Sequence, residues 1–137
     1  MESLFVRVGG QAFFDTLVEC FYMQVEGDPL LRPLYPADLR PPKRHLALFL
    51  AQYWGGPPTY NAERGHPRLR MRHVRFRIGR AERDAWLRHM RSAVDASPAS
   101  AEDAQALMAY FEMTATSLVN QSPKEVTPNQ DLGFKLR

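Results

Sequence analysis

The sequence is poor in cysteine and in long apolar runs, and each shortage argues against some classes of protein. Cys20 is the only cysteine among 137 residues, so no internal disulfide bond forms, and we expect an inert, packed thiol in a reducing cytoplasm. No stretch approaches the roughly 18 apolar residues of a membrane-spanning helix. Residues 1–7 lack the apolar centre and cleavage site of a signal peptide, so we expect no secretion signal.

The sequence also lacks strand-like alternation, internal repeats and the local motifs of several enzyme classes. No segment alternates apolar and polar residues in the way that predicts a half-buried strand. No glycine-rich loop suited to phosphate groups occurs. No two histidines have the spacing of a zinc-binding helix motif such as His-Glu-x-x-His, which argues against a zinc site. An all-α fold is therefore favoured.

What the sequence does have is the composition of one folded domain with unevenly distributed charge. Hydrophobic residues make up 45% and charged residues 24%, and 137 residues are enough to bury a core. The net charge is only +3, yet seven of the fifteen arginines fall between Arg64 and Arg80. A nucleic-acid surface usually adds stacking aromatics, and only Phe76 interleaves here. We therefore interpret the cluster as a solvated face and expect no nucleic-acid partner.

Four segments have apolar residues at three- and four-residue spacing, which predicts four principal helices. They cover residues 11–25, 42–54, 80–95 and, after a capping box formed by Ser100 and Asp103, the stretch up to Val119. Pro42 is compatible with the first turn of the second helix but not with a deeper position. The pattern ends at Ser122, so we expect a domain at 1–121 followed by a polar, mobile tail at 122–137.

A long loop and a short helix are expected between the second and third of these helices. The run Gly55, Gly56, Pro57 and Pro58 interrupts the chain, and Pro67 suits the first turn of a new helix that reaches His73. A loop of about ten residues with Gly and Pro at both ends usually has a function. Taken alone, a histidine at a helix end beside arginines is more often a surface residue, so local pattern leaves the role of His73 open.

Three motifs in this part of the chain occur together and in a fixed order. They are Gln52-Tyr53-Trp54-Gly55-Gly56-Pro57, Gly65-His66-Pro67-Arg68-Leu69-Arg70-Met71-Arg72-His73 and Arg83-Asp84-Ala85-Trp86-Leu87. Through them the chain, over roughly residues 3–121, resembles the group II truncated haemoglobins, small bacterial and plant globins. The resemblance implies an all-α truncated globin fold, a two-over-two helical sandwich around haem. It also decides between a helical bundle and a globin, which periodicity alone leaves open.

The resemblance assigns roles to residues that are far apart in the sequence. It implies haem b as the cofactor and His73 as the iron ligand. It implies that Tyr22, Tyr35 and Trp86 face the distal side and stabilise the bound ligand, although any one of them alone would be interpreted as a core aromatic. Oxygen on ferrous haem gains superoxide character, so three donors in an apolar pocket imply slow release of O2.

Further haem contacts are expected along an apolar slot and at its polar edge. The candidates are Leu46, Phe49 and Phe76 for the slot, and His45, Tyr60, His66 and Arg72 for the propionate groups. His45 stands where the resembled family often has Arg or Lys, and a histidine is only partly charged at neutral pH. Pro42 departs from the alanine, serine or threonine usual at its position, and we expect it to shift the start of its helix and loosen the ligand gate.

Three functions stay open from the sequence, and we favour the first. It is a ligand-binding haem protein whose partners are the diatomic gases O2, CO and NO. The second is a haem enzyme, a nitric oxide dioxygenase or a peroxidase-like protein, which needs a separate reductase because no flavin or nicotinamide domain is fused. The third is a helical binding module without a cofactor. The oligomeric state is open between a monomer and a homo-oligomer.

Overall fold

The computed structural model describes residues 2–74 and 76–121, and within them it contains helices and no strand. The elements are α1 (Leu4–Val8), α2 (Gln11–Glu26), the 3-10 helix η1 (Arg32–Leu34), α3 (Arg40–Tyr53), α4 (Thr59–Arg64), α5 (Leu69–His73), α6 (Arg80–Asp95) and α7 (Ala101–Ser117). The all-α prediction is confirmed, and α2, α3, α6 and α7 are the four principal helices. Among the described helices, none is both long enough and apolar enough to cross a membrane. The expected tail at 122–137 lies outside the described residues.

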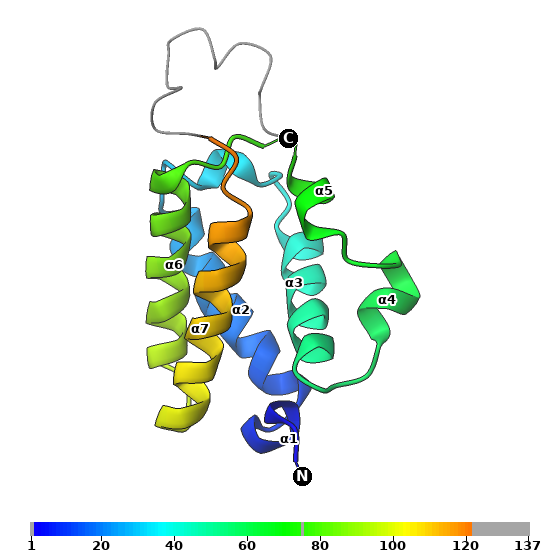
Figure 1. Ribbon diagram of the computed structural model, residues 1–137. Helices are drawn as coiled ribbons and strands as arrows, with labels where there is room; N and C mark the ends of the chain where they lie inside the picture. The colour runs from blue at the N-terminus through cyan, green and yellow to red at the C-terminus, as the bar shows by residue number, and fades with distance from the viewer. Residues whose placement is uncertain (1, 75, 122–137) are drawn as a thin grey trace, which may run out of the picture.

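The four long helices form two antiparallel pairs, α2 with α3 and α6 with α7 (Figure 1). Helix α2 also packs against α6 and so joins the two pairs. The C-terminal ends of α2 and α7 and the N-terminal ends of α3 and α6 gather at one end of the molecule, where α5 also lies (Figure 1). Segments far apart in the sequence therefore converge at this end.

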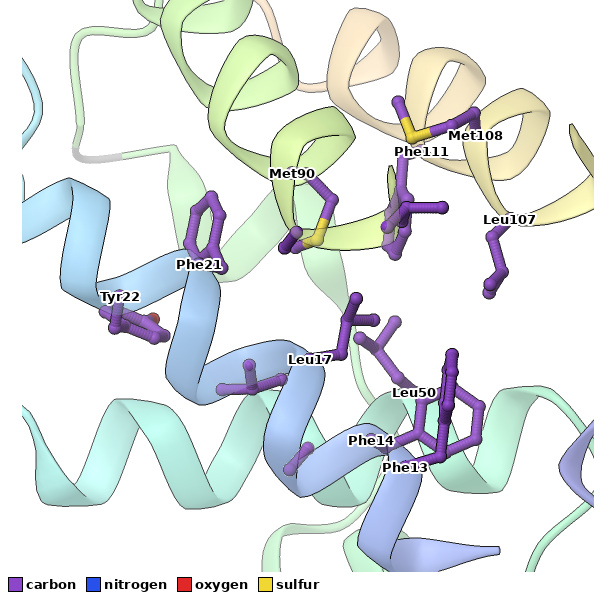
Figure 2. Close-up of a cluster of buried hydrophobic side chains, with 14 of the residues drawn as sticks. Phe13, Phe14, Leu17, Phe21, Tyr22, Leu50, Met90, Leu107, Met108 and Phe111 are labelled. Atoms are coloured by element: carbon purple, nitrogen blue, oxygen red, sulfur yellow. The ribbon is translucent and has the colours of Figure 1, made fainter. Parts of the chain in front are cut away.

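The core is centred on α2, whose apolar residues recur at helical spacing (Figure 2). The most deeply buried members of this stripe, each at most 2% exposed, are Phe14, Leu17, Val18, Phe21 and Val25. Around them lie fully buried partners from the other long helices: Leu50, Met90, Leu107 and Phe111 (Figure 2). Burying one such side chain contributes about 1.5–3 kcal/mol, so the stripe of α2 holds both helix pairs together.

Helix α1 was not predicted, and it packs on the glycine pair that follows α3. With five residues it is too short to display a helical period, but Ser3 caps it by accepting the N–H of Val6 at 3.3 Å. A Cβ atom on Gly55 would lie 2.5 Å from the Cβ of Ser3, and one on Gly56 would lie 2.7 Å from the ring of Phe5. The two glycines therefore do more than interrupt the chain, because their lack of a side chain makes room for α1.

The segment between α3 and α6 also differs from the prediction. Helix α4 occupies part of the expected loop, and its single buried residue, Tyr60, gives no periodic signal. The prediction that Pro67 lies in the first turn of the next helix is wrong, because α5 begins at Leu69. The physical reason is Arg68, whose φ of 48° is in the left-handed region and prevents a continuous helix through it.

An ion pair ties α1 to the start of α7. Asp103 is 5% exposed, and its carboxylate accepts three hydrogen bonds from the guanidinium of Arg7 at 2.9–3.3 Å. The hydrogen-bonded guanidinium of Arg7 holds the pKa of Asp103 below its usual value of 3.8. A carboxyl group with a depressed folded pKa stabilises the fold above its unfolded pKa, and the contribution is lost as the pH falls through the folded value.

Replacing Arg7 by methionine is expected to lower the thermal midpoint at neutral pH, because the buried carboxylate of Asp103 then lacks its cation. The difference from wild type should shrink once the pH falls below about 4, where the carboxyl group protonates. Thermal scans from neutral pH down to about pH 3 measure it. The control Arg91→Met breaks an exposed pair with Glu112 and should change little. A deficit that stays constant across the pH series would instead assign the effect to lost packing.

Removing the tail at 122–137 is expected to leave the domain intact. The segment has two prolines and few large apolar residues before Leu132. A protein ending at Gln121 should keep its thermal midpoint within about 5 °C, roughly 1 kcal/mol for a domain of this size. A larger drop in a thermal scan would show that Leu132, Phe134 or Leu136 packs against the core.

Candidate functional site

A cavity of about 390 Å³ lies where the ends of the helices converge. Cofactor and ligand sites typically enclose about 300–1,000 Å³. Every helix after α1 contributes to the wall, and most lining side chains are aliphatic or aromatic. Ten of the eleven residues that we predicted for the site line it: Tyr22, Tyr35, His45, Leu46, Phe49, Tyr60, Arg72, His73, Phe76 and Trp86. His66 does not.

His73 is the last residue of α5, and its own helix orients its ring. Its Nδ1 lies 2.6 Å from the carbonyl oxygen of Leu69, one helical turn earlier. A carbonyl oxygen only accepts hydrogen bonds, so Nδ1 carries the proton and donates it. In the neutral ring Nε2 then keeps its lone pair, which is the form in which histidine binds a metal. The cavity wall thus includes an imidazole whose tautomer is fixed by a backbone carbonyl.

Tyr22, Tyr35 and Trp86 come from three elements, α2, the end of η1 and α6, and cluster at the cavity. The rings of Tyr22 and Tyr35 meet edge to face, with their centroids 5.3 Å apart. Burial raises the pKa of Tyr35 to about 12, against hydrogen bonding with Trp86 and Tyr22, which lowers it. Burial, together with Tyr35, also raises the pKa of Tyr22. Both phenols therefore stay protonated at neutral pH, and with the indole they bring three donors together.

The polar edge of the cavity is built by His45, Tyr60 and Arg64. One Nη of Arg64 lies 3.2 Å from Nε2 of His45, and because a guanidinium only donates, His45 accepts as a neutral ring. Burial and the charge of Arg64 lower the pKa of His45, in agreement with that geometry. Arg64 also lies over the ring of Tyr60, 6.0 Å from its centroid. The cation at this edge is therefore Arg64.

Arg72 and His66 have contacts other than those expected of propionate ligands. The Nε of Arg72 donates to the carbonyl of Pro67 at 2.7 Å, and one Nη donates to the carbonyl of Arg64 at 3.0 Å. His66 is exposed, and its Nδ1 accepts the N–H of Arg68 at 3.3 Å. Arg72 thus fixes the backbone before α5, and His66 lies away from the cavity.

Pro42 lies in the first turn of α3 and lines the cavity. The helix starts at Arg40, two residues earlier than predicted, and Oδ1 of Asp38 accepts the N–H of Arg40 at 3.0 Å. Pro41 and Pro42 have no N–H group, so they remove donors that a helix start leaves without a partner. Asp38 and the two prolines therefore account together for N–H groups at the start of this helix, and the expected loosening of a ligand gate stays a prediction.

Sequence reasoning missed part of the cavity wall. The missed residues include Leu31, Leu34, Arg64, Ile78, Tyr110 and Leu118. Arg64 belongs to the basic cluster, where nothing local separates it from its neighbours. Tyr110 and Leu118 lie on the apolar stripe of the final helix, and a cavity position gives the same pattern there as a core position.

The comparisons with known proteins agree with the all-α fold and with the cavity described above. The model of the bacterial-like globin family matches residues 3–120. The group 2 truncated haemoglobin of Bacillus subtilis (strain 168) is 42% identical over 116 residues, which are 85% of this chain and 88% of that protein. This chain belongs to the group 2 truncated haemoglobins.

Two solved structures show how closely this truncated haemoglobin follows its relatives. The haemoglobin of the thermophilic phototrophic bacterium Chloroflexus aurantiacus is 47% identical and superposes with a TM-score of 0.87, covering 88% of this chain and all (100%) of that one. The truncated oxygen-avid haemoglobin from Bacillus subtilis is 39% identical with a TM-score of 0.82, covering 87% and 100%. The two-over-two globin fold expected from the resemblance is confirmed.

Globin membership implies haem, and the residues on the cavity wall of this truncated haemoglobin fit that group. A porphyrin supplies four nitrogen ligands to its iron, so one further neutral imidazole on the cavity wall suits it, and His73 would be that residue here. The aliphatic and aromatic lining suits the apolar porphyrin faces. Arg64 and Tyr60 at the polar edge suit carboxylate groups, because a guanidinium and a phenol both donate to them.

Proposed function

We propose that the chain binds haem b, with His73 as the iron ligand, and that it captures O2 and releases it slowly. The observation that carries the proposal is that one apolar cavity is lined both by an imidazole of fixed tautomer and by three clustered donors. Those donors are Tyr22, Tyr35 and Trp86. Haem iron with a histidine ligand binds diatomic gases, and bound O2 carries partial negative charge.

Each of these residues then has a separate task. Through the Nδ1–H bond to Leu69, the backbone presents Nε2 of His73 in the form that binds metal. Tyr22 and Tyr35 keep their protons at neutral pH and so remain available as donors. The indole of Trp86 is a donor only and favours a ligand atom with negative charge. The related Bacillus subtilis structure is described as oxygen-avid, which supports slow release.

The absorption spectrum of the purified protein is the direct test of this proposal. We expect haem bands, conversion on reduction, and separate shifts when O2 or CO is added to the reduced protein. Adding haemin to the haem-free chain should restore the same spectrum with a stoichiometry near one. A chain that purifies without a chromophore and does not take up haemin would instead be a helical binding module without a cofactor.

The partners proposed with this function are the gases O2, CO and NO. Nitric oxide dioxygenase or peroxidase-like turnover would add a separate reductase, and no contact within residues 2–74 and 76–121 favours that alternative over ligand binding. A cytoplasmic location rests on the single cysteine, Cys20, which is a free thiol in the structure. Size-exclusion chromatography of the haem-loaded protein distinguishes a monomer from a homo-oligomer.

A further inference from the structure

Asn120 lies just beyond the end of α7 and makes four hydrogen bonds to backbone at and after His73. Its N–H donates to the carbonyl oxygen of Ile78 at 2.8 Å, and its Oδ1 accepts the N–H of Ile78 at 2.9 Å. Its Nδ2 donates to the carbonyl of Phe76 at 2.7 Å and, at 3.5 Å, to that of His73. One side chain thus uses its acceptor on Ile78 and its donor on Phe76, in the short stretch that follows His73.

Helix α5 depends on such outside support. An isolated helix becomes stable only at about 12–15 residues, and α5 has five, with no side chain capping its start. Arg72 secures its N-terminal side through the carbonyls of Pro67 and Arg64. Asn120 supports its C-terminal side, where the carbonyl of His73 accepts the N–H of Phe76 at 3.0 Å and, at the longer distance of 3.5 Å, Nδ2 of Asn120.

The stretch that Asn120 holds also belongs to the cavity. Phe76 and Ile78 line it, whereas Asn120 is not among the lining residues. At its far end the stretch joins α6, where the N–H of Gly79 donates to the carboxylate of Glu82 at 2.8 Å. Asn120 therefore acts on the site only through backbone, by closing the interval between α5 and α6.

We propose that Asn120 is a positioning residue for His73, because it fixes the backbone on the C-terminal side of the histidine and so the approach of Nε2 to the iron. The inference rests on the proposed function, which assigns Nε2 to the iron. Outer partners that orient a metal-binding histidine commonly change metal affinity by about 10- to 100-fold. A looser segment lets α5 pivot and weakens the bond to iron without altering any residue that lines the cavity.

Asn120→Asp in the full-length chain tests this role with little change of shape. It keeps an acceptor for the N–H of Ile78 but turns an oxygen, instead of the Nδ2 donor, towards the carbonyls of Phe76 and His73. We expect haem transfer to excess apomyoglobin to become about 10-fold faster. In resonance Raman spectra of the reduced protein, the iron–histidine stretching band should shift and broaden. Asn120→Ser, which cannot reach Phe76 and adds no charge, is the second variant and should behave alike.

The control is Ser117→Ala, in the last turn of α7, whose hydroxyl donates to the carbonyl of Thr114 at 2.6 Å. It should leave the transfer rate and the Raman band at their wild-type values. If both Asn120 variants lower the thermal midpoint of the haem-free chain but leave the band unchanged, the residue is merely structural and the proposal is overturned. A wild-type protein without haem would reject the proposed function itself. A wild-type protein that binds haem, together with Asn120 variants that keep the wild-type transfer rate and Raman band, would reject the positioning role alone.

Discussion

His73→Ala is expected to leave the purified protein almost free of haem. Two histidines, His45 and His73, line the cavity, and a backbone carbonyl fixes the tautomer of His73 alone. No other lining group matches His73 as an iron ligand. His45 lines the cavity too, but its Nε2 is occupied by Arg64. Losing the protein ligand to the iron should cost more than the roughly 10- to 100-fold in affinity that an outer-shell partner costs.

The matched control for this variant is His66→Ala. His66 belongs to the same motif but is exposed and lies away from the cavity, so its removal should keep haem content near wild type. Added imidazole should restore part of the haem binding in His73→Ala, because it replaces the missing ring in the space that alanine leaves. Haem content per chain from absorption spectra measures all three samples. Full occupancy with an unchanged reduced spectrum in His73→Ala would contradict the assignment.

The long helices were predictable from the sequence because each carries a complete apolar stripe. Phe14, Phe21 and Val25 repeat at helical spacing and are fully buried, so pattern and packing agree in α2. The short helices α1 and α4 have no room for a period, and tertiary contacts form them instead. The close approach of Phe5 to Gly56 is an example, since neither residue signals it locally.

From the sequence we could name those site residues that lie within recognisable motifs. The other site residues are identified by their neighbours in the folded structure. The resemblance nominated His73 and Trp86 through two separate motifs, and both lie at one cavity. It nominated His45 for the polar edge, yet the cation there is Arg64, since packing of α4 against α3 brings the two together. Asn120 sits where periodicity has already ended, so only the fold reveals its contacts with the segment after α5.

Trp86→Phe is expected to speed the release of O2 by roughly 10- to 150-fold. The indole N–H donates to negative charge, and a hydrogen bond to a charged group is worth about 1.5–3 kcal/mol. Taking ~1.4 kcal/mol per factor of ten, complete loss of that bond on release gives the stated range. Tyr22 and Tyr35 lie close enough to re-form part of the network, which would move the result towards the lower end.

The fold should survive this substitution because Phe keeps most of the aromatic contact. The indole of Trp86 packs against Phe21 and Phe111, with centroid separations of 5.0 and 5.6 Å. The chain has a second tryptophan, Trp54, which provides a matched control. Trp54 does not line the cavity, and its Nε1 is buried with no hydrogen-bond partner among the described residues. Trp54→Phe should therefore leave the release of O2 unchanged.

Stopped-flow dissociation of O2 and CO from wild type, Trp86→Phe and Trp54→Phe separates the physical causes. Carbon monoxide carries little charge when bound, so its release from Trp86→Phe should change far less than that of O2. A similar acceleration for both gases would show that Trp86 restricts the exit path by its bulk and does not act through its N–H. No change for either gas would make Trp86 a plain core residue, because neither its donor nor its volume would then control the ligand.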